Sequence, residues 1–197
     1  MKHQVVMFDV DGVLADFMKG FTALVAQKYG NPVVTDHDYA LWDVYPGLNK
    51  EMADHGWSRV KESHDFWQNL DSLVSKEVFW QINDMQEDGQ VDTYFVTHRQ
   101  GCGVRKQTAR WLWAHGITSP TVILSGNKGE VARGINADFM IDDKAGNVIF
   151  TAYHSPKTHV FVVDRPYNQF ESGVVGSRVC RVKTVEEFLT FVDLARR

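Results

Sequence analysis

The chain has 197 residues, of which 44% are hydrophobic and 23% charged, as in an ordinary soluble protein with one large domain or one domain carrying an insertion. The formal net charge of −4 provides no overall basic field, so stable binding to nucleic acid is not expected. No apolar run approaches the roughly 20 residues that cross a bilayer, and the first predicted strand leaves no room for a signal peptide. Cys102 and Cys180 form neither a CxxC pair nor a disulfide framework, so a reducing, cytoplasmic location is expected.

The first predicted strand ends in two aspartates. An apolar run up to Phe8 is followed by Asp9 and Asp11, and Gly12 comes next. A short apolar run closed by a turn signal is typical of a buried strand in a parallel sheet, and ligands of such sheets bind beyond the carboxyl ends of the strands. Taken alone, the pattern is equally typical of a strand end with an ordinary turn, because Asp and Gly are common turn residues.

Residues 16–75 are predicted to form an inserted helical cap. Apolar residues from Phe17 to Val25 recur with helical spacing, and Gly30 and Pro32 end that helix. The stretch from about 33 to 75 contains no convincing strand and is rich in aromatic residues: Tyr39, Trp42, Tyr45, Trp57, Phe66 and Trp67. These aromatic residues form either the core of the cap or a wall against which a base or another ring binds.

The remainder of the chain alternates between predicted strands and helices. Strands are predicted at 91–97, 121–124, 138–141 and 159–163, with a further edge strand at 178–182. Thr184 and Glu187 form a capping box at the start of the final helix. This alternation predicts an α/β fold with a doubly wound, mostly parallel, Rossmann-like sheet, in which residues 1–15 and 76–197 form the core domain.

Four predicted strands each lead to residues that can handle a phosphoryl group. The first leads to Asp9 and Asp11, the second ends in Thr97, the third leads to Lys128, and the fourth leads to Asp142 and Asp143. One carboxylate can attack phosphorus, and a second carboxyl group can donate a proton to the departing oxygen. Carboxylates can also hold Mg²⁺, while a hydroxyl group and a lysine bind the phosphoryl oxygens.

These motifs resemble those of the haloacid dehalogenase-like (HAD) hydrolase superfamily over nearly the whole chain. The motifs are Phe-Asp-Val-Asp-Gly at 8–12, Thr97, Lys128 and Ile-Asp-Asp at 141–143. The resemblance implies that Asp9 is the nucleophile and Asp11 the general acid and base. It also implies that Thr97 and Lys128 bind the phosphoryl group. Mg²⁺ would be held by Asp9, the backbone carbonyl of Asp11, and one or both of Asp142 and Asp143.

A narrower resemblance is to the 5'(3')-deoxyribonucleotidases. Asp-Gly-Val-Leu-Ala-Asp-Phe at 11–17 is nearly theirs, and Leu41-Trp42-Asp43 falls where they carry aromatic residues against the base. This resemblance implies that Phe17, Leu41 and Trp42 line a pocket for the nucleoside. The implied substrate is a small phosphomonoester, namely a nucleoside monophosphate.

The sequence departs from the deoxyribonucleotidase pattern at three positions. Lys61 stands where that family tends to carry tryptophan, His98 stands in place of serine after the motif threonine, and Gly126 replaces a basic residue. Lys61, His98 and Arg99 complete the candidate substrate-binding residues. The hypothesis for the segment that begins at His98 is that His98 or Arg99 touches a substrate phosphate or ribose, since helix N-termini already favour anions.

Other functions remain open at this stage. The same chemistry could act on a sugar phosphate or on a 3'-phosphate end of a nucleic acid, although a long cap and an acidic net charge disfavour nucleic-acid ends. A non-catalytic nucleotide- or protein-binding module is a third reading. The sequence does not determine the oligomeric state, and a homodimer is one arrangement that it allows.

Overall fold

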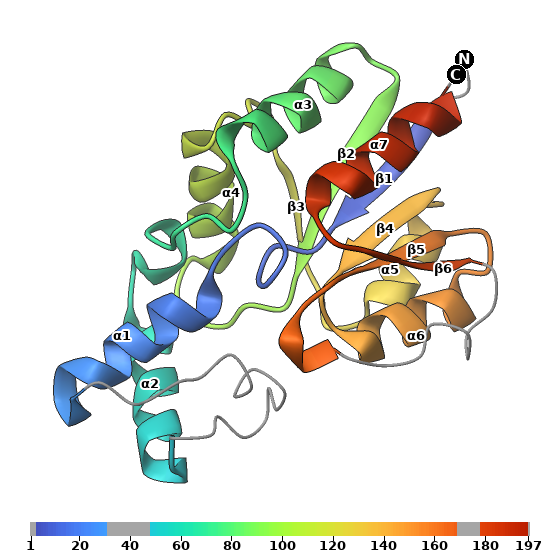
Figure 1. The fold of residues 1–197 in the computed structure, drawn as a ribbon. Helices are drawn as coiled ribbons and strands as arrows, with labels where there is room; N and C mark the ends of the chain where they lie inside the picture. Colours follow the sequence, from blue (N-terminus) through green and yellow to red (C-terminus); the bar gives the residue numbers. More distant parts are fainter. Residues whose placement is uncertain (1–2, 31–47, 169–177, 197) are drawn as a thin grey trace.

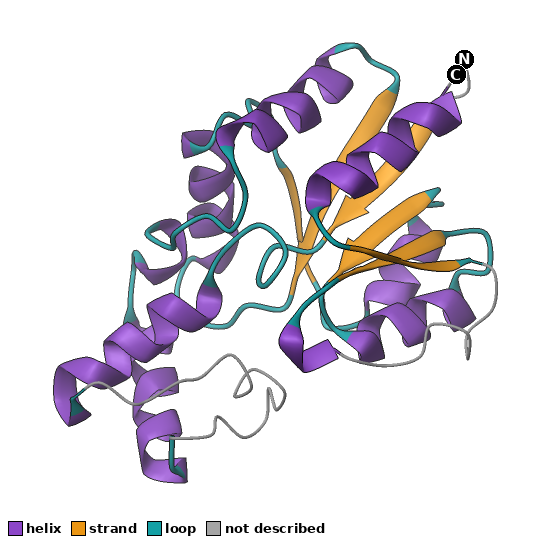
Figure 2. Cartoon of the chain, in the orientation of Figure 1, coloured by secondary structure: helices purple, strands orange, loops and turns teal. Residues whose placement is uncertain are grey.

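The computed structural model describes residues 3–30, 48–168 and 178–196. Its strands form a single six-stranded, wholly parallel sheet in the order β3-β2-β1-β4-β5-β6 (Figure 2). They are β1 (Gln4–Phe8), β2 (Val91–Thr97), β3 (Thr121–Leu124), β4 (Phe139–Asp142), β5 (His159–Val163) and β6 (Val179–Val182). The predicted doubly wound α/β fold is confirmed, because this is the strand order of the dinucleotide-binding Rossmann folds.

The helices fill the connections between the strands. The α-helices are α1 (Phe17–Tyr29), α2 (Lys50–Glu62), α3 (Lys76–Glu87), α4 (Val104–Ala114), α5 (Lys128–Gly134), α6 (Ala145–His154) and α7 (Val185–Arg196), and the 3₁₀ turns are η2 (Phe66–Gln68) and η3 (Pro166–Asn168). No helix in the described ranges has both the length and the apolar character needed to span a membrane.

Two apolar layers cover the faces of the sheet, because successive strand side chains point to opposite sides. On one face Phe8 stacks on Phe95 at 5.7 Å and meets Phe188 of α7 edge-on at 5.6 Å, and α3 and α4 pack on the same face. On the other face Met7 and its neighbours pack against α5 and α6. The central strands are thus buried on both faces of the sheet. A site can therefore form only beyond the ends of the strands, and in such folds it forms beyond their carboxyl ends.

The site lies where the strand order reverses. β1 pairs with β2 on one side and with β4 on the other, so Phe8 lies beside both Phe95 and Ile141. The residues that follow these positions come together at one edge of the sheet. Ligands of open α/β folds bind at such a switch point.

Helices α1 and α2 extend away from this edge and pack against each other (Figure 1). Gly56 permits their close approach, since a Cβ atom there would lie 2.6 Å from the ring of Phe21. We propose that residues 16–75 form a cap, as the sequence predicts. The end of this segment is anchored to the core, because Trp111 of α4 donates its indole N–H to the carbonyl of Leu70 at 2.7 Å.

Candidate active site

Asp9 and Lys128 form the centre of the site. Asp9 follows β1 directly and is 5% exposed, and its Oδ1 accepts hydrogen bonds from the backbone N–H of Val10 and from Lys128 Nζ, both at 2.7 Å. Lys128 is the first residue of α5, and its Nζ also lies 2.6 Å from Asp142 Oδ2. One buried ammonium group thus joins the ends of β1 and β4.

Asp142 and Asp143 lie beside Asp9 at the end of β4. Asp142 is fully engaged by the protein: besides Lys128, it accepts the backbone N–H of Lys144 at 2.8 Å and the side-chain amide of Asn147 at 3.0 Å. Asp143 accepts a hydrogen bond from the Tyr167 hydroxyl at 2.5 Å through Oδ2. Its Oδ1 is buried and has no hydrogen-bond partner among the described residues.

Burial, together with the neighbouring charges, shifts the pKa values of these groups. Burial raises the pKa of Asp9 well above its ordinary value; the Lys128 charge opposes this, while neighbouring carboxylates reinforce it. Burial and the charge of Asp142 raise the pKa of Asp143 to about 6. Burial lowers the pKa of Lys128, but the Asp142 and Asp9 carboxylates more than offset it, so that pKa is raised and the ammonium form persists.

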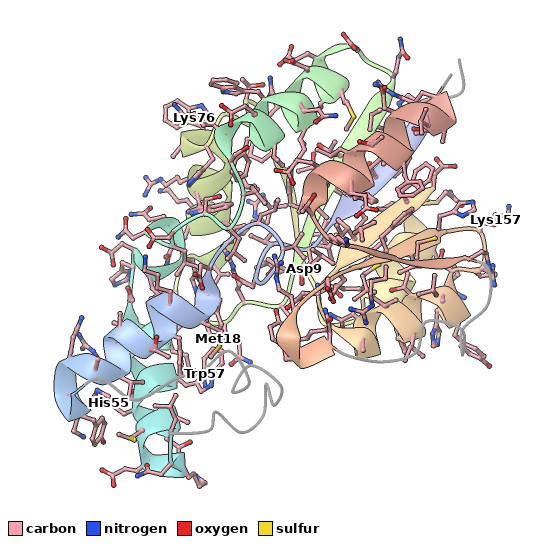
Figure 3. The ribbon with its side chains drawn as sticks, viewed as in Figure 1. Asp9, Met18, His55, Trp57, Lys76 and Lys157 are labelled. Atoms are coloured by element: carbon pink, nitrogen blue, oxygen red, sulfur yellow. The ribbon has the colours of Figure 1, made fainter. Side chains whose placement is uncertain are left out.

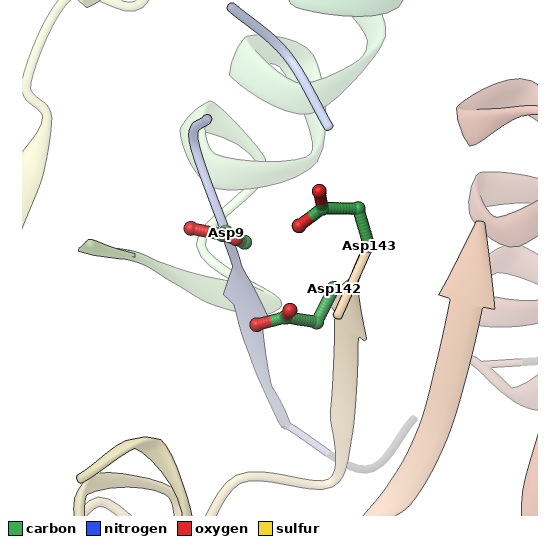
Figure 4. Close-up of side chains that lie close together, drawn as sticks. All are labelled: Asp9, Asp142 and Asp143. Atoms are coloured by element: carbon green, nitrogen blue, oxygen red, sulfur yellow. The ribbon is translucent and has the colours of Figure 1, made fainter. Parts of the chain in front are cut away.

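These three carboxyl groups fit a divalent cation. Asp9, Asp142 and Asp143 each offer an oxygen, and these oxygens lie within 4.8 Å of one another (Figure 4). Carboxylate oxygen is the ligand that Mg²⁺ prefers, and the orphaned Oδ1 of Asp143 lacks a partner that such an ion would supply. Burial is the largest cause of the raised pKa of Asp9, and the neighbouring carboxylates add a smaller rise that a bound cation would oppose.

Asp11 lies next to this group and is held by a guanidinium fork. Arg99 Nε donates to Asp11 Oδ2 at 2.9 Å and Arg99 Nη2 donates to Asp11 Oδ1 at 2.8 Å. The Thr97 hydroxyl donates to Asp11 Oδ2 at 3.1 Å. The structure therefore brings together all four predicted catalytic residues: Asp9, Asp11, Thr97 and Lys128.

A cavity of about 680 Å³ opens over these residues, within the range of small-molecule sites. Asp9, Asp11, Thr97 and Lys128 lie among its lining, and aromatic side chains form one of its walls. Phe17 stands in the middle of this wall, stacked between Trp67 and Trp57 with ring centroids 5.5 Å away on each side. Figure 3 shows Asp9 at the edge of the sheet and Trp57 on the cap side.

The predicted substrate-binding residues are distributed unevenly. Phe17 and His98 line the cavity. Lys61 is exposed at the last turn of α2 and is not among the described lining residues, and the buried Arg99 is not among them either. Leu41 and Trp42 lie outside the described residues. Binding of substrate by each of these residues stays a prediction.

Several supporting residues were not predicted from the sequence. Asn147 contacts Asp142, Tyr167 contacts Asp143, and Asn168 donates to the carbonyl oxygens of Asp143 and Val163 at 2.7 Å. Tyr167 and Asn168 come shortly after β5, which pairs with β4, the strand that leads to Asp143. This position in the sequence could have indicated that they lie near the site. The turn at 165–168 thus borders the site.

Solved structures share this fold over almost the whole chain. They include proteins described as a haloacid dehalogenase-like hydrolase of Burkholderia xenovorans (12% identity, TM-score 0.60, 96% of each chain) and a magnesium-bound HAD-hydrolase of Bacillus subtilis (13%, 0.58, 97% of this chain and 99% of that one). A third is described as a beta-phosphoglucomutase of Thermotoga maritima (17%, 0.57, 96% and 98%). At these identities the likeness establishes the fold, which is that of the HAD-like hydrolases. A search of curated proteins finds no match.

The particular family follows from the sequence as a whole. A family model described as 5' nucleotidase, deoxy (pyrimidine), cytosolic type C protein (NT5C) matches residues 3–191. The chain belongs to this family, and it is accordingly a phosphoric monoester hydrolase of the HAD superfamily.

Proposed function

We propose that the protein is a Mg²⁺-dependent 5'-nucleotidase that removes the phosphate of nucleoside monophosphates through an aspartyl-phosphate on Asp9. The observation that carries this proposal is the placement of Asp9, which lies buried beside Lys128 with Asp11 and Thr97 at the same cavity. A binding module would need neither a nucleophile nor a neighbouring acid.

The reaction proceeds in two steps on these side chains. A carboxylate oxygen of Asp9 forms a bond to phosphorus, the bond from phosphorus to the ester oxygen breaks, and that oxygen keeps the electron pair and takes a proton from Asp11. In the second step water attacks phosphorus and gives a proton to Asp11, and the bond between phosphorus and Asp9 breaks. Lys128 and the Thr97 hydroxyl lie where they can hold the phosphoryl oxygens during both steps.

Mg²⁺ would be held by Asp9, by the backbone carbonyl of Asp11 and by the end of β4. Within that end we assign the direct ligand to Asp143, because its Oδ1 has no partner in the described part of the chain, whereas both oxygens of Asp142 are already engaged. When bound, the ion offsets the repulsion between the anionic nucleophile and the anionic substrate.

The aromatic wall supports a nucleoside as the leaving group. Trp57 is half-buried at the cavity that holds the nucleophile and can offer ring surface there, while the buried rings of Phe17 and Trp67 support it from within the wall. Stacking of a base on an aromatic side chain is worth about 1–3 kcal/mol in nucleic-acid proteins. Sugar phosphates are the alternative substrate class, because aromatic side chains also stack on sugars.

Phosphate release from a panel of esters tests this function. Ribo- and deoxyribonucleoside monophosphates, hexose phosphates and p-nitrophenyl phosphate are compared with Mg²⁺ and with chelator. We expect Mg²⁺-dependent turnover that is fastest on nucleoside monophosphates and that Asp9→Asn abolishes. The exposed Asp92→Asn is the matched control, and it should behave as the wild type. Turnover confined to hexose phosphates would refute the nucleotidase assignment, and equal turnover in chelator would refute the Mg²⁺ requirement.

A further inference from the structure

Each of the three nitrogens of the Arg99 guanidinium donates a hydrogen bond inside the protein. Nε and Nη2 donate to the two oxygens of Asp11, and Nη1 donates to the Thr108 hydroxyl at 2.9 Å. The plane of the group lies over the Trp67 ring, 4.7 Å from its centroid. The Arg99 side chain has no exposed surface, although its neighbours His98 and Gln100 line the cavity.

We propose that Arg99 is a positioning residue that fixes the carboxyl group of Asp11 beside the reacting phosphoryl group. The inference rests on the proposed function, in which Asp11 passes a proton to and from the reacting oxygens. It assigns Arg99 a role through Asp11 in place of contact with the substrate.

The geometry explains why a fork is needed. Asp11 lies in the turn after β1, and its two side-chain torsions would leave the carboxyl group free to rotate. The single Thr97 hydrogen bond, at 3.1 Å to one oxygen, does not prevent that rotation. Two parallel N–H···O bonds fix both oxygens and hence the plane of the carboxyl group, which a lysine cannot do because it presents a point charge.

Arg99 can impose this orientation because it is itself held from two sides. Thr108 belongs to the core helix α4, where its hydroxyl also donates to the carbonyl of Val104 at 2.9 Å. Trp67 is held by two hydrogen bonds, from its indole N–H to Gln100 O at 3.0 Å and from its backbone N–H to Gln107 Oε1 at 2.9 Å. Asp11 is thereby tied to α4, while the same Trp67 stacks on Phe17 of the cavity wall.

The first test compares two leaving groups in order to separate an effect on proton transfer from an effect on phosphate binding. kcat/KM reports the steps up to departure of that group; a nucleoside alcohol needs a proton from Asp11, whereas p-nitrophenolate leaves without one. We expect Arg99→Lys and Arg99→Ala to lower kcat/KM for a nucleoside monophosphate by roughly 10²-fold, the size of a general-acid contribution. The value for p-nitrophenyl phosphate should fall by less than about threefold, since general-acid catalysis is then not required.

A double-mutant cycle tests whether the effect passes through Asp11. In an Asp11→Asn background, Arg99→Lys should cause no further loss of kcat/KM for the nucleoside monophosphate, because the carboxyl group that Arg99 orients is already gone. Thr108→Val removes only one support of Arg99. It should lower the ratio of kcat/KM for the nucleoside monophosphate to kcat/KM for p-nitrophenyl phosphate, as the Arg99 variants do, but by a smaller factor. Arg105→Ala, an exposed cation of the same segment, is the matched control and should leave both values unchanged.

The outcomes are distinct. Equal losses on both esters would overturn the inference, because they would indicate phosphate binding or a general loss of structure. Additive losses in the cycle, or unchanged kcat/KM in both Arg99 variants, would also overturn it. If Arg99→Ala fails to fold, Arg99→Lys and Thr108→Val decide the question. If the wild-type protein turns over neither ester, the proposed function has failed; if the wild type is active and the ratio does not change, only this inference has failed.

Discussion

The turn after Asp9 depends on the glycine at position 12. Its φ of +80° lies in the left-handed region, and a Cβ atom there would lie 2.1 Å from Asp143 Oδ2. The chain therefore passes the second acidic strand end at a distance that only glycine permits. Arg165 reinforces this turn by donating its Nε–H to the carbonyl of Gly12 at 3.0 Å.

Replacing Gly12 with alanine should damage both the fold and the cation site. We expect Gly12→Ala to lower the free energy of unfolding by about 2–4 kcal/mol, because the overlap with Asp143 adds to the backbone strain. Gly89→Ala is the control, since Gly89 has a φ of +66° but nothing within 4 Å of the added atom. Chemical denaturation of both variants measures the difference. An equal loss in the two would show that strain alone, and not the approach to Asp143, makes glycine necessary.

Asp143 should give the metal-free protein an unusual response to pH. Its pKa is raised from 3.8 to about 6, so the folded state binds its proton more tightly than the unfolded chain does. The resulting stabilisation is complete below the unfolded value and is lost as pH rises through about 6. In chelator, the free energy of unfolding of the wild type should therefore fall between pH 4 and pH 6.5 more steeply than that of Asp143→Asn. Parallel curves for the two proteins would contradict the pKa assignment.

At the scale of elements, the paired helices α1 and α2 supply one wall of the cavity to a site built on the sheet. Trp57 of α2 and Phe17, the first residue of α1, both line the cavity, and their rings stack on each other. Specificity for the leaving group is therefore expected to depend on the cap, while phosphoryl transfer depends on the ends of β1, β2 and β4.

Trp57→Ala tests this division of roles. The variant should raise KM for nucleoside monophosphates by about tenfold, since a lost stacking contact costs on the order of 1–3 kcal/mol, and should change kcat little. KM for a small alkyl phosphate should not change. Trp113→Ala, which removes a 68% exposed tryptophan of α4, is the matched control. A rise in KM of equal size for every ester would place Trp57 in phosphate binding or in the structure of the site.

The elements themselves could be predicted, because each is encoded by local pattern. The run before Asp9 and the run before Thr97 are strands, and Thr184 accepts the N–H of Glu187 at 3.2 Å as the capping box requires. The second half of that box differs: Glu187 accepts the N–H of Lys183, one residue before the predicted donor. Which backbone N–H donates to Glu187 depends on the torsion angles of its side chain, and these cannot be predicted from the spacing of residues in the sequence.

The partners of the site residues were beyond local pattern. Arg99 and Asp11 are 88 positions apart, and their pairing follows from the register of β1 with β2 rather than from any motif. A basic residue near a helix N-terminus reads locally as a ligand for an anion. The structure shows that Arg99 pairs with a carboxylate of the protein itself, a partner that local pattern does not indicate, and substrate binding by Arg99 stays a prediction.

At the scale of the whole molecule, the sheet brings together carboxyl groups whose mutual repulsion a bound cation would reduce. The ends of β1 and β4 supply three buried carboxyl groups around a single lysine. Aromatic side chains of α1, α2 and η2 line the same cavity. The proposed function therefore draws on one site, with Asp9 as the nucleophile, Asp11 as the acid and the aromatic wall as a surface for the base of the nucleoside.

Mg²⁺ should therefore stabilise the whole fold, and not only permit turnover. We expect the melting temperature at pH 8 to rise with Mg²⁺ concentration in the wild type, because an ion that binds only the folded state adds to its stability. Asp143→Asn should abolish this rise while keeping the fold in chelator. A rise of the same size in Asp143→Asn would show that the ion binds elsewhere.

The stereochemical course of the reaction tests whether Asp9 is the nucleophile. A nucleoside thiophosphate monoester made chiral at phosphorus with an oxygen isotope is hydrolysed in isotopically labelled water, and the configuration of the released thiophosphate is determined. Attack by Asp9 followed by attack of water involves two inversions, so we expect net retention of configuration. Inversion would show that water displaces the nucleoside in a single step, and Asp9 would then not be the nucleophile.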